Sequence, residues 1–344
     1  MTSAIDDLLL AKDVSITKSE RLFRCLFAQT KNNPEIAETV LLLLRKKGES
    51  PNELGGFIRA VRKLEKTIPQ TRFPDLVDGC GTGGDGANTF NISTIASFVA
   101  AGAGAHVAKH GNRSISSQCG SADLLEALGV KIDASRNRML KALKEARIGY
   151  FHAPLYHPAF RAFQPLRQKL AQRYKTGTIF NIAGPFLNPL RPARQAIGVF
   201  NQDLTGVVAE TAKKLKMKRV LVFRNSDGID ELTTTNRSIL VEVNKKTLRT
   251  KIIAPAQFGF KKGKQSELKG GKRKLNRKIA LNILTNQETN ATRKNTVLLN
   301  AAAILYASGR AKTLNHGIEL AKNSIKSGAA YEALKKLIRI SHDA

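Results

Sequence analysis

Apolar residues recur at helical spacing through the first ~70 residues of the chain. Ile36, Val40 and Leu44 fall on one face of a predicted helix. A second helix is predicted to begin at Ser50-Pro51-Asn52-Glu53, because this segment combines a capping box with proline at the first helical position. The apolar stripe of that helix runs through Leu54, Phe57, Ile58, Val61 and Leu64. The pattern predicts a small N-terminal helical domain over residues 1–72.

From residue 75 onward, short β-branched runs alternate with helical patterns. Strands are predicted at residues 75–78, 106–109, 149–152, 178–181, 196–200, 219–224 and 239–243. Helices are predicted at residues 94–102, 121–128, 135–146 and 203–216, and helices also close the chain after a polar, loop-like segment at 285–295. This alternation is typical of an α/β fold with a mostly parallel central sheet and helices on both faces. We therefore expect a large α/β domain over residues 73–344.

The segment Asp78–Thr94 joins the first predicted strand to the next helix. Its five glycines remove side chains from the turn, so backbone N–H groups can approach a ligand closely. Asn91, Ser93 and Thr94 fall where the helix begins, at its free amides and positive dipole end. Ligands of parallel sheets bind beyond the carboxyl ends of the strands. The segment is therefore typical of a phosphate-binding loop.

Two other interpretations of this loop stay open. Gly79-x-Gly81-x-x-Gly84 satisfies the dinucleotide-binding fingerprint, but no helix opens at once and the next predicted strand ends in basic residues. A purely structural turn would not need five glycines together with Asp85, Asn88 and Asn91. A Walker A motif is excluded, because no Gly-Lys-Ser/Thr follows the glycines.

Basic and hydroxyl-bearing clusters follow the later strands. Lys109-His-Gly-Asn-Arg113 offers two cations, an imidazole and an amide, which suit a phosphate site, although a solvated charge run is the alternative. The stretch Ser114–Asp123 adds hydroxyls and a glycine ahead of a helix. Ala153-Pro-Leu-Tyr-His-Pro158 is followed by Arg167. These clusters point to an anionic substrate.

Paired carboxylates follow another predicted strand, in Asp227-Gly-Ile-Asp230-Glu231. An isolated Asp-Glu pair is more often part of the surface. Beside a phosphate loop in the same sheet, the pair suits Mg²⁺, which prefers carboxylates together with substrate phosphates and water. The sequence thus predicts a magnesium site.

Composition changes this picture in one respect, the charge. The 344 residues carry 57 Lys and Arg against 27 Asp and Glu, a net charge of +30. Residues 245–278 concentrate this excess, with thirteen Lys/Arg and one acid, Glu267. Nucleic-acid binding and a merely solvated basic surface both account for it, and nonspecific adhesion to polyanions is the expectation we favour. Three widely spaced cysteines, no secretory signal and no membrane-spanning run predict a cytoplasmic protein.

The clusters together resemble the anthranilate phosphoribosyltransferase family of tryptophan biosynthesis. The resemblance runs in order across nearly the whole chain. It is carried by Lys47-Gly-Glu-Ser-Pro51, Gly81-Thr-Gly-Gly-Asp85, Asn91-Ile-Ser-Thr94, Lys109-His-Gly-Asn-Arg113, Gly120-Ser-Ala-Asp-Leu-Leu125, Ala153-Pro-Leu-Tyr-His-Pro158, Ile179-Phe-Asn-Ile-Ala-Gly-Pro-Phe-Leu-Asn-Pro189, Asp230-Glu231, Leu268-Lys-Gly-Gly271 and Leu299-Asn-Ala-Ala302.

The resemblance implies a small helical domain, completed by helices near 158–176 and hinged to the α/β domain, usually in a homodimer. It implies transfer of the phosphoribosyl group of 5-phosphoribosyl 1-pyrophosphate to anthranilate, with Mg²⁺ as cofactor. The phosphoribosyl donor would contact Gly81, Gly84, Asp85, Thr89, Asn91, Ile92, Ser93, Thr94, Lys109 and Ser121. Anthranilate would contact Gly81, His110, Asn112, His157 and Arg167, and magnesium would bind Ser93, Asp230 and Glu231. Anthranilate's amine is neutral near pH 7, so no single residue is expected to act as an essential general base.

Some positions depart from the family pattern. Gln118 and Cys119 stand where lysine and serine are usual, and Gly177 stands where arginine is common. The link Arg224-Asn-Ser-Asp227 also differs, and the charge of +30 is unusual for the family. None of these departures touches the residues expected to bind magnesium or anthranilate. A transferase-fold protein that mainly binds nucleic acid is the alternative, and a pyrimidine nucleoside phosphorylase is a third possibility that lacks its own signature here.

Overall fold

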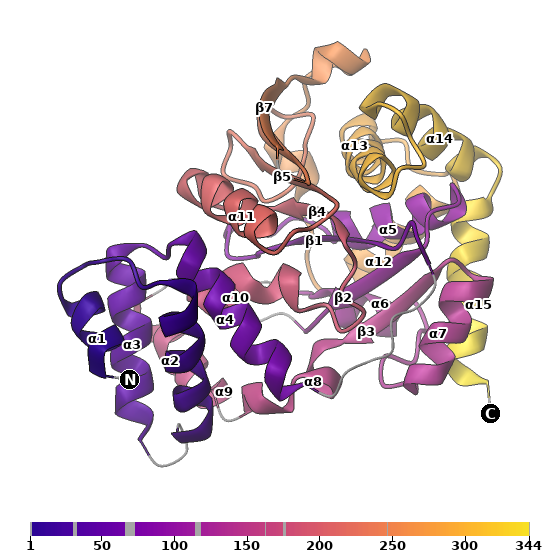
Figure 1. The fold of residues 1–344 in the computed structure, drawn as a ribbon. Helices are drawn as coiled ribbons and strands as arrows, with labels where there is room; N and C mark the ends of the chain where they lie inside the picture. The colour runs from indigo at the N-terminus through magenta and orange to yellow at the C-terminus, as the bar shows by residue number, and fades with distance from the viewer. Residues whose placement is uncertain are drawn as a thin grey trace.

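A seven-stranded sheet forms the centre of the protein (Figure 1), with the strand order β3-β2-β1-β4-β5-β6-β7. The computed structural model describes residues 2–29, 33–65, 73–113, 118–161, 163–174, 177–245 and 247–343. The strands are β1 (Val77–Gly81), β2 (Val107–Gly111), β3 (Ile148–His152), β4 (Arg194–Gly198), β5 (Arg219–Asn225), β6 (Ser238–Asn244) and β7 (Thr247–Ile253).

The first five strands pair in parallel, and β6 and β7 add an antiparallel edge. The chain winds outward from β1 to β3 and then returns to place β4 on the other side of β1. The junction of β1 and β4 is therefore the topological switch point, where α/β sheets form their ligand crevice. The expected mostly parallel α/β fold is confirmed.

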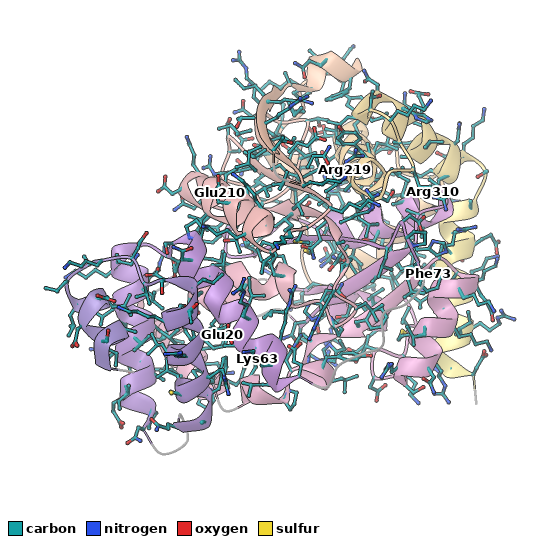
Figure 2. All side chains as sticks on the ribbon, viewed as in Figure 1. Glu20, Lys63, Phe73, Glu210, Arg219 and Arg310 are labelled. Carbon is teal, nitrogen blue, oxygen red and sulfur yellow. The ribbon has the colours of Figure 1, made fainter. Side chains whose placement is uncertain are left out.

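Helices of the N-terminal segment form a layer beside the sheet, at the left of Figure 1. This helical layer consists of α1 (Thr2–Leu9), α2 (Ile16–Gln29), α3 (Pro34–Lys47) and α4 (Pro51–Leu64), with α9 (Gln164–Tyr174) and the short α10 (Ile179–Ala183). Lys169 on α9 pairs with Glu38 on α3 at 2.7 Å. A second ion pair, Lys63 with Glu20 at 2.5 Å, joins α4 to α2, and Figure 2 labels both residues.

The predicted capping box starts α4. Ser50 N–H donates to Glu53 Oε2 at 2.9 Å, and Glu53 N–H donates to Ser50 Oγ at 3.3 Å. Such a cap is worth about 1 kcal/mol. Four of the predicted stripe residues are buried, but Leu64 at the end of the helix is 44% exposed.

Two hydrophobic cores cover the two faces of the sheet. Alternation along β5 sends Leu221 and Phe223 into one core and Val220 and Val222 into the other. The first core joins the sheet to α5 (Ile92–Gly102), α6 (Ser121–Ala127), α7 (Arg136–Glu145), α12 (Arg273–Leu284), α13 (Ala291–Ser308), α14 (Leu314–Lys326) and α15 (Ala329–His342). The second core continues through α11 (Gln202–Lys214) into the helical layer.

Two sequence predictions about secondary structure were wrong, and one strand was missed. Residues 178–181 are not a strand: Thr178 N–H donates to Asn181 Oδ1 at 3.1 Å, and this cap starts α10 instead. Residues 247–253, predicted only as part of a basic block, form the edge strand β7. The segment 285–295 is loop only up to Asn290, which caps α13. The boundary predicted at residue 72 lies outside the described residues.

Short helices complete the connections between these elements. They are α8 (Ala153–Tyr156), η1 (Pro158–Arg161), η2 (Gly184–Leu187), η3 (Pro255–Phe258) and η4 (Gln265–Leu268). None of the helices in the described ranges combines the length and apolar character that a membrane span requires.

Candidate active site

The glycine-rich loop leaves β1 at the switch point. Gly83, Gly84 and Gly86 have φ angles of 66°, 89° and 66°, in the left-handed region that favours glycine. Within the described chain, the N–H groups of Gly84, Asp85 and Gly86 have no hydrogen-bond acceptor. The loop thus presents unused backbone donors, as the sequence predicted for a phosphate-binding turn.

The segment that carries Asp230 and Glu231 crosses the ends of β1 and β4. Gly81 and Gly198 pair in register there. A Cβ atom on Gly81 would lie 2.1 Å from Asp230 Oδ2, and one on Gly198 would lie 1.6 Å from the Asp230 carbonyl oxygen. The two acids can therefore reach the loop only because both strand ends lack side chains.

Each of these acids accepts a hydrogen bond from the backbone. Gly83 N–H donates to Asp230 Oδ2 at 2.8 Å, and Ser93 N–H, in the first turn of α5, donates to Glu231 Oε1 at 3.1 Å. Burial raises the pKa of Asp230 to about 7, and the neighbouring Asp85 carboxylate adds to the rise. Burial, followed by the charge of Asp230, raises the pKa of Glu231 well above its usual range. This concentration of negative charge favours a cation.

Asp85 adds a third carboxylate to the cluster. Its Oδ1 accepts from Ala87 N–H at 3.1 Å, while its Oδ2 is buried without a hydrogen-bond partner in the described chain. No group of three or more His, Cys, Asp or Glu among the described residues is arranged to hold a metal ion by itself. This donor set fits Mg²⁺, which keeps water and substrate phosphates among its ligands and needs only one or two carboxylates.

Lys109 lies beneath the loop and is 3% exposed. Its Nζ donates to the Gly79 carbonyl oxygen at 2.5 Å and to Ser93 Oγ at 3.4 Å. Its charge also lowers the pKa of Asp78, which burial nonetheless raises to about 6. A buried cation therefore sits among the acids and next to the helix start.

A cavity of about 320 Å³ lies over the loop. Every residue that the sequence analysis assigned to the donor or to magnesium lines it: Gly81, Gly84, Asp85, Thr89, Asn91, Ile92, Ser93, Thr94, Lys109, Ser121, Asp230 and Glu231. These residues come from β1 and the loop that follows it, from α5, β2 and α6, and from the segment after β5. Their contacts with a ligand stay predictions.

A second cavity of about 190 Å³ adjoins the first, and both include Gly81, His110 and Asn112 in their walls. The other two residues predicted for anthranilate, His157 and Arg167, also line it, together with Phe160 and Phe180. Arg167 Cζ lies 5.0 Å from the centre of the Phe180 ring. Burial lowers the pKa of Arg167 to about 10, and within the described chain it forms no ion pair.

The departures from the family pattern lie mostly at the margin of the site. Gln118 is exposed and lines neither cavity, whereas Cys119 lines the larger one. Gly177 lines neither. Asp227 closes the loop after β5 by accepting from Thr235 Oγ1 at 2.6 Å and Asn236 Nδ2 at 2.8 Å. The hydroxyls predicted at Ser114–Ser117 lie outside the described residues.

Comparison with known proteins agrees with this geometry. The family described as "Glycosyl transferase family, a/b domain" matches residues 73–331. An anthranilate phosphoribosyltransferase from Rubrobacter xylanophilus is 40% identical over 310 residues, which cover 90% of this chain and 88% of that protein. Another, from Alkaliphilus metalliredigens, is 37% identical over 343 residues and covers 100% of this chain and 99% of that protein. The chain belongs to the anthranilate phosphoribosyltransferase family.

Solved structures of this family have the same fold. The enzyme from Thermus thermophilus superimposes with a TM-score of 0.90 at 35% identity, covering 99% of both chains. The Saccharomyces cerevisiae enzyme, solved in complex with PRPP and Mg, gives a TM-score of 0.88 at 24% identity, covering 99% of this chain and 97% of that one. At that identity the yeast structure establishes the fold.

Gly198 is a site residue that sequence reasoning missed, because a single glycine at a strand end carries no distinct signal.

We expect Gly198→Ala to destabilise the protein by about 1–3 kcal/mol, since its Cβ would overlap the Asp230 carbonyl oxygen. Gly206→Ala is the matched control: Gly206 lies within α11, and a Cβ there meets no atom within 4 Å. It should stabilise by about 0.5–1 kcal/mol. Urea unfolding would measure both, and equal midpoints would contradict the proposed crowding.

Proposed function

We propose that this protein transfers the 5-phosphoribosyl group from 5-phosphoribosyl 1-pyrophosphate to anthranilate, giving N-(5-phosphoribosyl)anthranilate and pyrophosphate in tryptophan biosynthesis. The observation that carries the proposal is the pair of adjoining cavities. One combines an amide-lined loop, a buried lysine and acids, and the other combines arginine, imidazoles and phenyl rings. They meet at Gly81, where the reacting ends of donor and acceptor would face one another.

The larger cavity supplies the donor site. The free amides of the glycine loop offer donors to phosphate oxygens, and Lys109 offers a fixed positive charge. Thr89, Asn91 and Ser121 add polar groups around the sugar and its phosphates. The full set proposed for the donor is the one predicted from the sequence.

Ser93, Asp230 and Glu231 are the residues we propose for Mg²⁺. The crowding of the two acids supports this assignment, as does the PRPP and Mg complex of the yeast enzyme. When bound, the ion would neutralise part of the charge that develops on the departing pyrophosphate. Asp85, whose Oδ2 accepts from no donor in the described part of the chain, lies beside Asp230 and adds to the attraction for a cation.

The smaller cavity supplies the acceptor site. Arg167 can hold the anthranilate carboxylate through a two-pronged, charge-assisted hydrogen bond, because its guanidinium has no acidic partner in the described chain. Asn112, His110 and His157 complete the polar wall, and Phe160 and Phe180 offer apolar faces to the ring.

Catalysis then follows mainly from position and charge. Positive charge develops on the ribose as its bond to pyrophosphate breaks and the amine approaches. The acids near the loop can stabilise the positive charge on the ribose. The cations around the phosphates can stabilise the negative charge on the departing pyrophosphate. The amine of anthranilate is neutral near pH 7, so its attack needs no essential general base.

Nucleic-acid binding as the main role has no support beyond the net charge, because the residues proposed for the transferase site line the two adjoining cavities and the relatives are transferases. The basic residues of 272–278 are nevertheless exposed. Lys272, Lys274, Arg277 and Lys278 form no ion pairs in the described chain, whereas Arg273 pairs with Asp123 at 2.6 Å. We therefore keep nonspecific polyanion binding as a secondary proposal. We also propose that the protein forms a homodimer and that it is cytoplasmic. Cell fractionation would check the location.

Two solution measurements test these secondary proposals. Retention on heparin should fall steeply as salt is raised, because the screening length shrinks to about 3 Å at 1 M. Sedimentation should give the mass of a dimer, since Leu9 and Leu10 on the helical layer are 62% and 65% exposed. Salt-independent retention or a monomer mass would contradict the respective proposal.

The main proposal is tested by mixing the protein with anthranilate, phosphoribosyl pyrophosphate and Mg²⁺ and following the loss of anthranilate fluorescence. We expect turnover that stops when a chelator removes the metal and returns when Mg²⁺ is restored. Asp230→Asn combined with Glu231→Gln should abolish the response to Mg²⁺. Absence of turnover in the unmodified protein would refute the proposed activity.

Arg167→Ala should raise the KM for anthranilate at least about tenfold, the equivalent of 1.4 kcal/mol. The KM for the donor should change little, because Arg167 lines only the smaller of the two cavities. Lys169→Ala, two positions along the same helix, is the matched control: Lys169 pairs with Glu38 and lines neither cavity. Steady-state kinetics with each substrate varied would decide, and an unchanged anthranilate KM would exclude the role.

A further inference from the structure

The segment Leu268–Gly271 lies against the end of the glycine-rich loop. Two backbone hydrogen bonds join them: Phe90 N–H donates to the Leu268 carbonyl oxygen at 3.0 Å, and Gly270 N–H donates to the Asn88 carbonyl oxygen at 2.9 Å. A Cβ atom on Gly270 would lie 2.7 Å from the backbone nitrogen of Phe90, so this close approach requires a glycine. The segment thus brings the start of α12 next to the larger cavity.

The first turn of α12 carries a buried asparagine, Asn276, which is 2% exposed. Its Oδ1 accepts from Gly271 N–H at 3.0 Å, and its Nδ2 donates to Asn91 Oδ1 at 3.0 Å. Asn91 Nδ2 donates in turn to the Cys119 carbonyl oxygen at 2.9 Å. This relay begins at a backbone N–H, which only donates, and ends at a backbone carbonyl, which only accepts. The orientation of both side-chain amides is therefore fixed.

Asn91 is the residue at which α5 begins, but it does not cap that helix. Asparagine is a preferred residue at this position, because its side-chain oxygen ordinarily accepts from an N–H two or three residues into the helix. The Asn91 side chain makes no such hydrogen bond. Its oxygen accepts from Asn276 instead. The relay therefore draws the capping group away from its own helix.

One amide in the first turn of α5 stays open as a result. Ile92 N–H donates to the Phe90 carbonyl oxygen at 2.7 Å, and Ser93 N–H donates to Glu231 Oε1 at 3.1 Å. Thr94 N–H has no acceptor among the residues that the structure describes, and Thr94 lines the larger cavity. An open amide at the positive end of a helix is suited to a phosphate oxygen.

We propose that Asn276 is a positioning residue for the phosphoribosyl donor: it holds the Asn91 side chain off α5 and so keeps the Thr94 amide available to a phosphate oxygen. Without Asn276, the Asn91 oxygen would turn to Thr94 N–H and cap the helix in the ordinary way. The Asn91 amide would then also release the Cys119 carbonyl oxygen in the cavity wall. The part of this inference that concerns the donor rests on the proposed function.

Backbone NMR of the deuterated protein tests the state of the Thr94 amide without any turnover. In the unmodified, ligand-free protein, its chemical shift should depend steeply on temperature, as for an amide without an acceptor. Addition of phosphoribosyl pyrophosphate and Mg²⁺, without anthranilate, should make that dependence shallow. In Asn276→Ala it should be shallow before any ligand is added, because Asn91 then caps the helix.

The matched control is Asn282→Ala, at a partly buried asparagine on the same helix that lines neither cavity. It should leave the Thr94 amide unchanged. A hydrogen-bonded Thr94 amide in the unmodified, ligand-free protein would overturn the proposal, even if Asn276→Ala failed to fold. Binding of phosphoribosyl pyrophosphate that left this amide unchanged would overturn the role in donor binding.

Kinetics test the consequence for the donor. Asn276→Ala should raise the KM for the donor about tenfold and leave the KM for anthranilate within about twofold. The reason is that Asn91, through which Asn276 acts, lines only the larger cavity. In an Asn91→Ala background the same substitution should add no further rise, because the side chain that it restrains is gone.

Equal effects on both substrates, or a full additional rise in the double variant, would refute the positioning role. Asn282→Ala should change neither KM. Lack of turnover in the unmodified protein would refute the proposed function alone, since the NMR comparison of the ligand-free proteins would still decide whether Asn276 holds Asn91 off the helix.

Discussion

The site depends on one steric constraint, the close passage of the Asp230–Glu231 segment over the ends of β1 and β4. Gly81 and Gly198 pair in register at that point, and a side chain on either would occupy the space of Asp230. Protein interiors are packed too densely to absorb such an overlap without moving backbone. The acids, the glycine loop and the start of α5 can therefore come together only while both strand ends stay bare.

This close approach gathers several acidic side chains in one buried place. Asp230 and Glu231 take up two backbone donors, at Gly83 and Ser93, yet burial still raises the pKa of both acids. Asp85 adds a buried oxygen that accepts from no donor among the described residues, and Lys109 supplies a buried positive charge nearby. A divalent cation and a phosphorylated ligand would complete this arrangement, since each supplies the charge that the other lacks. The exposed basic residues of 272–278 lie on the surface and line neither cavity.

The smaller cavity has a different origin, because both layers of the protein build it. Arg167 and Phe180 come from helices of the helical layer. His110 lies near the end of β2, and Asn112 follows that strand. The phenyl rings that line the cavity also belong to an aromatic cluster: Phe160 and Phe180 lie 5.0 Å apart, and Phe57 on α4 lies 4.9 Å from Phe180. Packing within the helical layer therefore sets the shape of the cavity.

The sequence by itself determined the features whose signals are local. The cap at Ser50, the glycine loop and the strand–helix alternation each follow from neighbouring residues, and the order of the motifs was enough to place every predicted site residue around the two cavities. Short apolar runs were ambiguous, because a few residues at 178–181 fit a strand until the Asn181 side chain caps the turn. The exposed edge strand β7 was missed because four of its seven residues are polar or charged. Contacts such as that of Gly198 with Asp230, or that of Glu65 with His157 92 residues away, were decided only by the tertiary structure. The fold brings together residues that lie far apart in the sequence, where no local pattern links them.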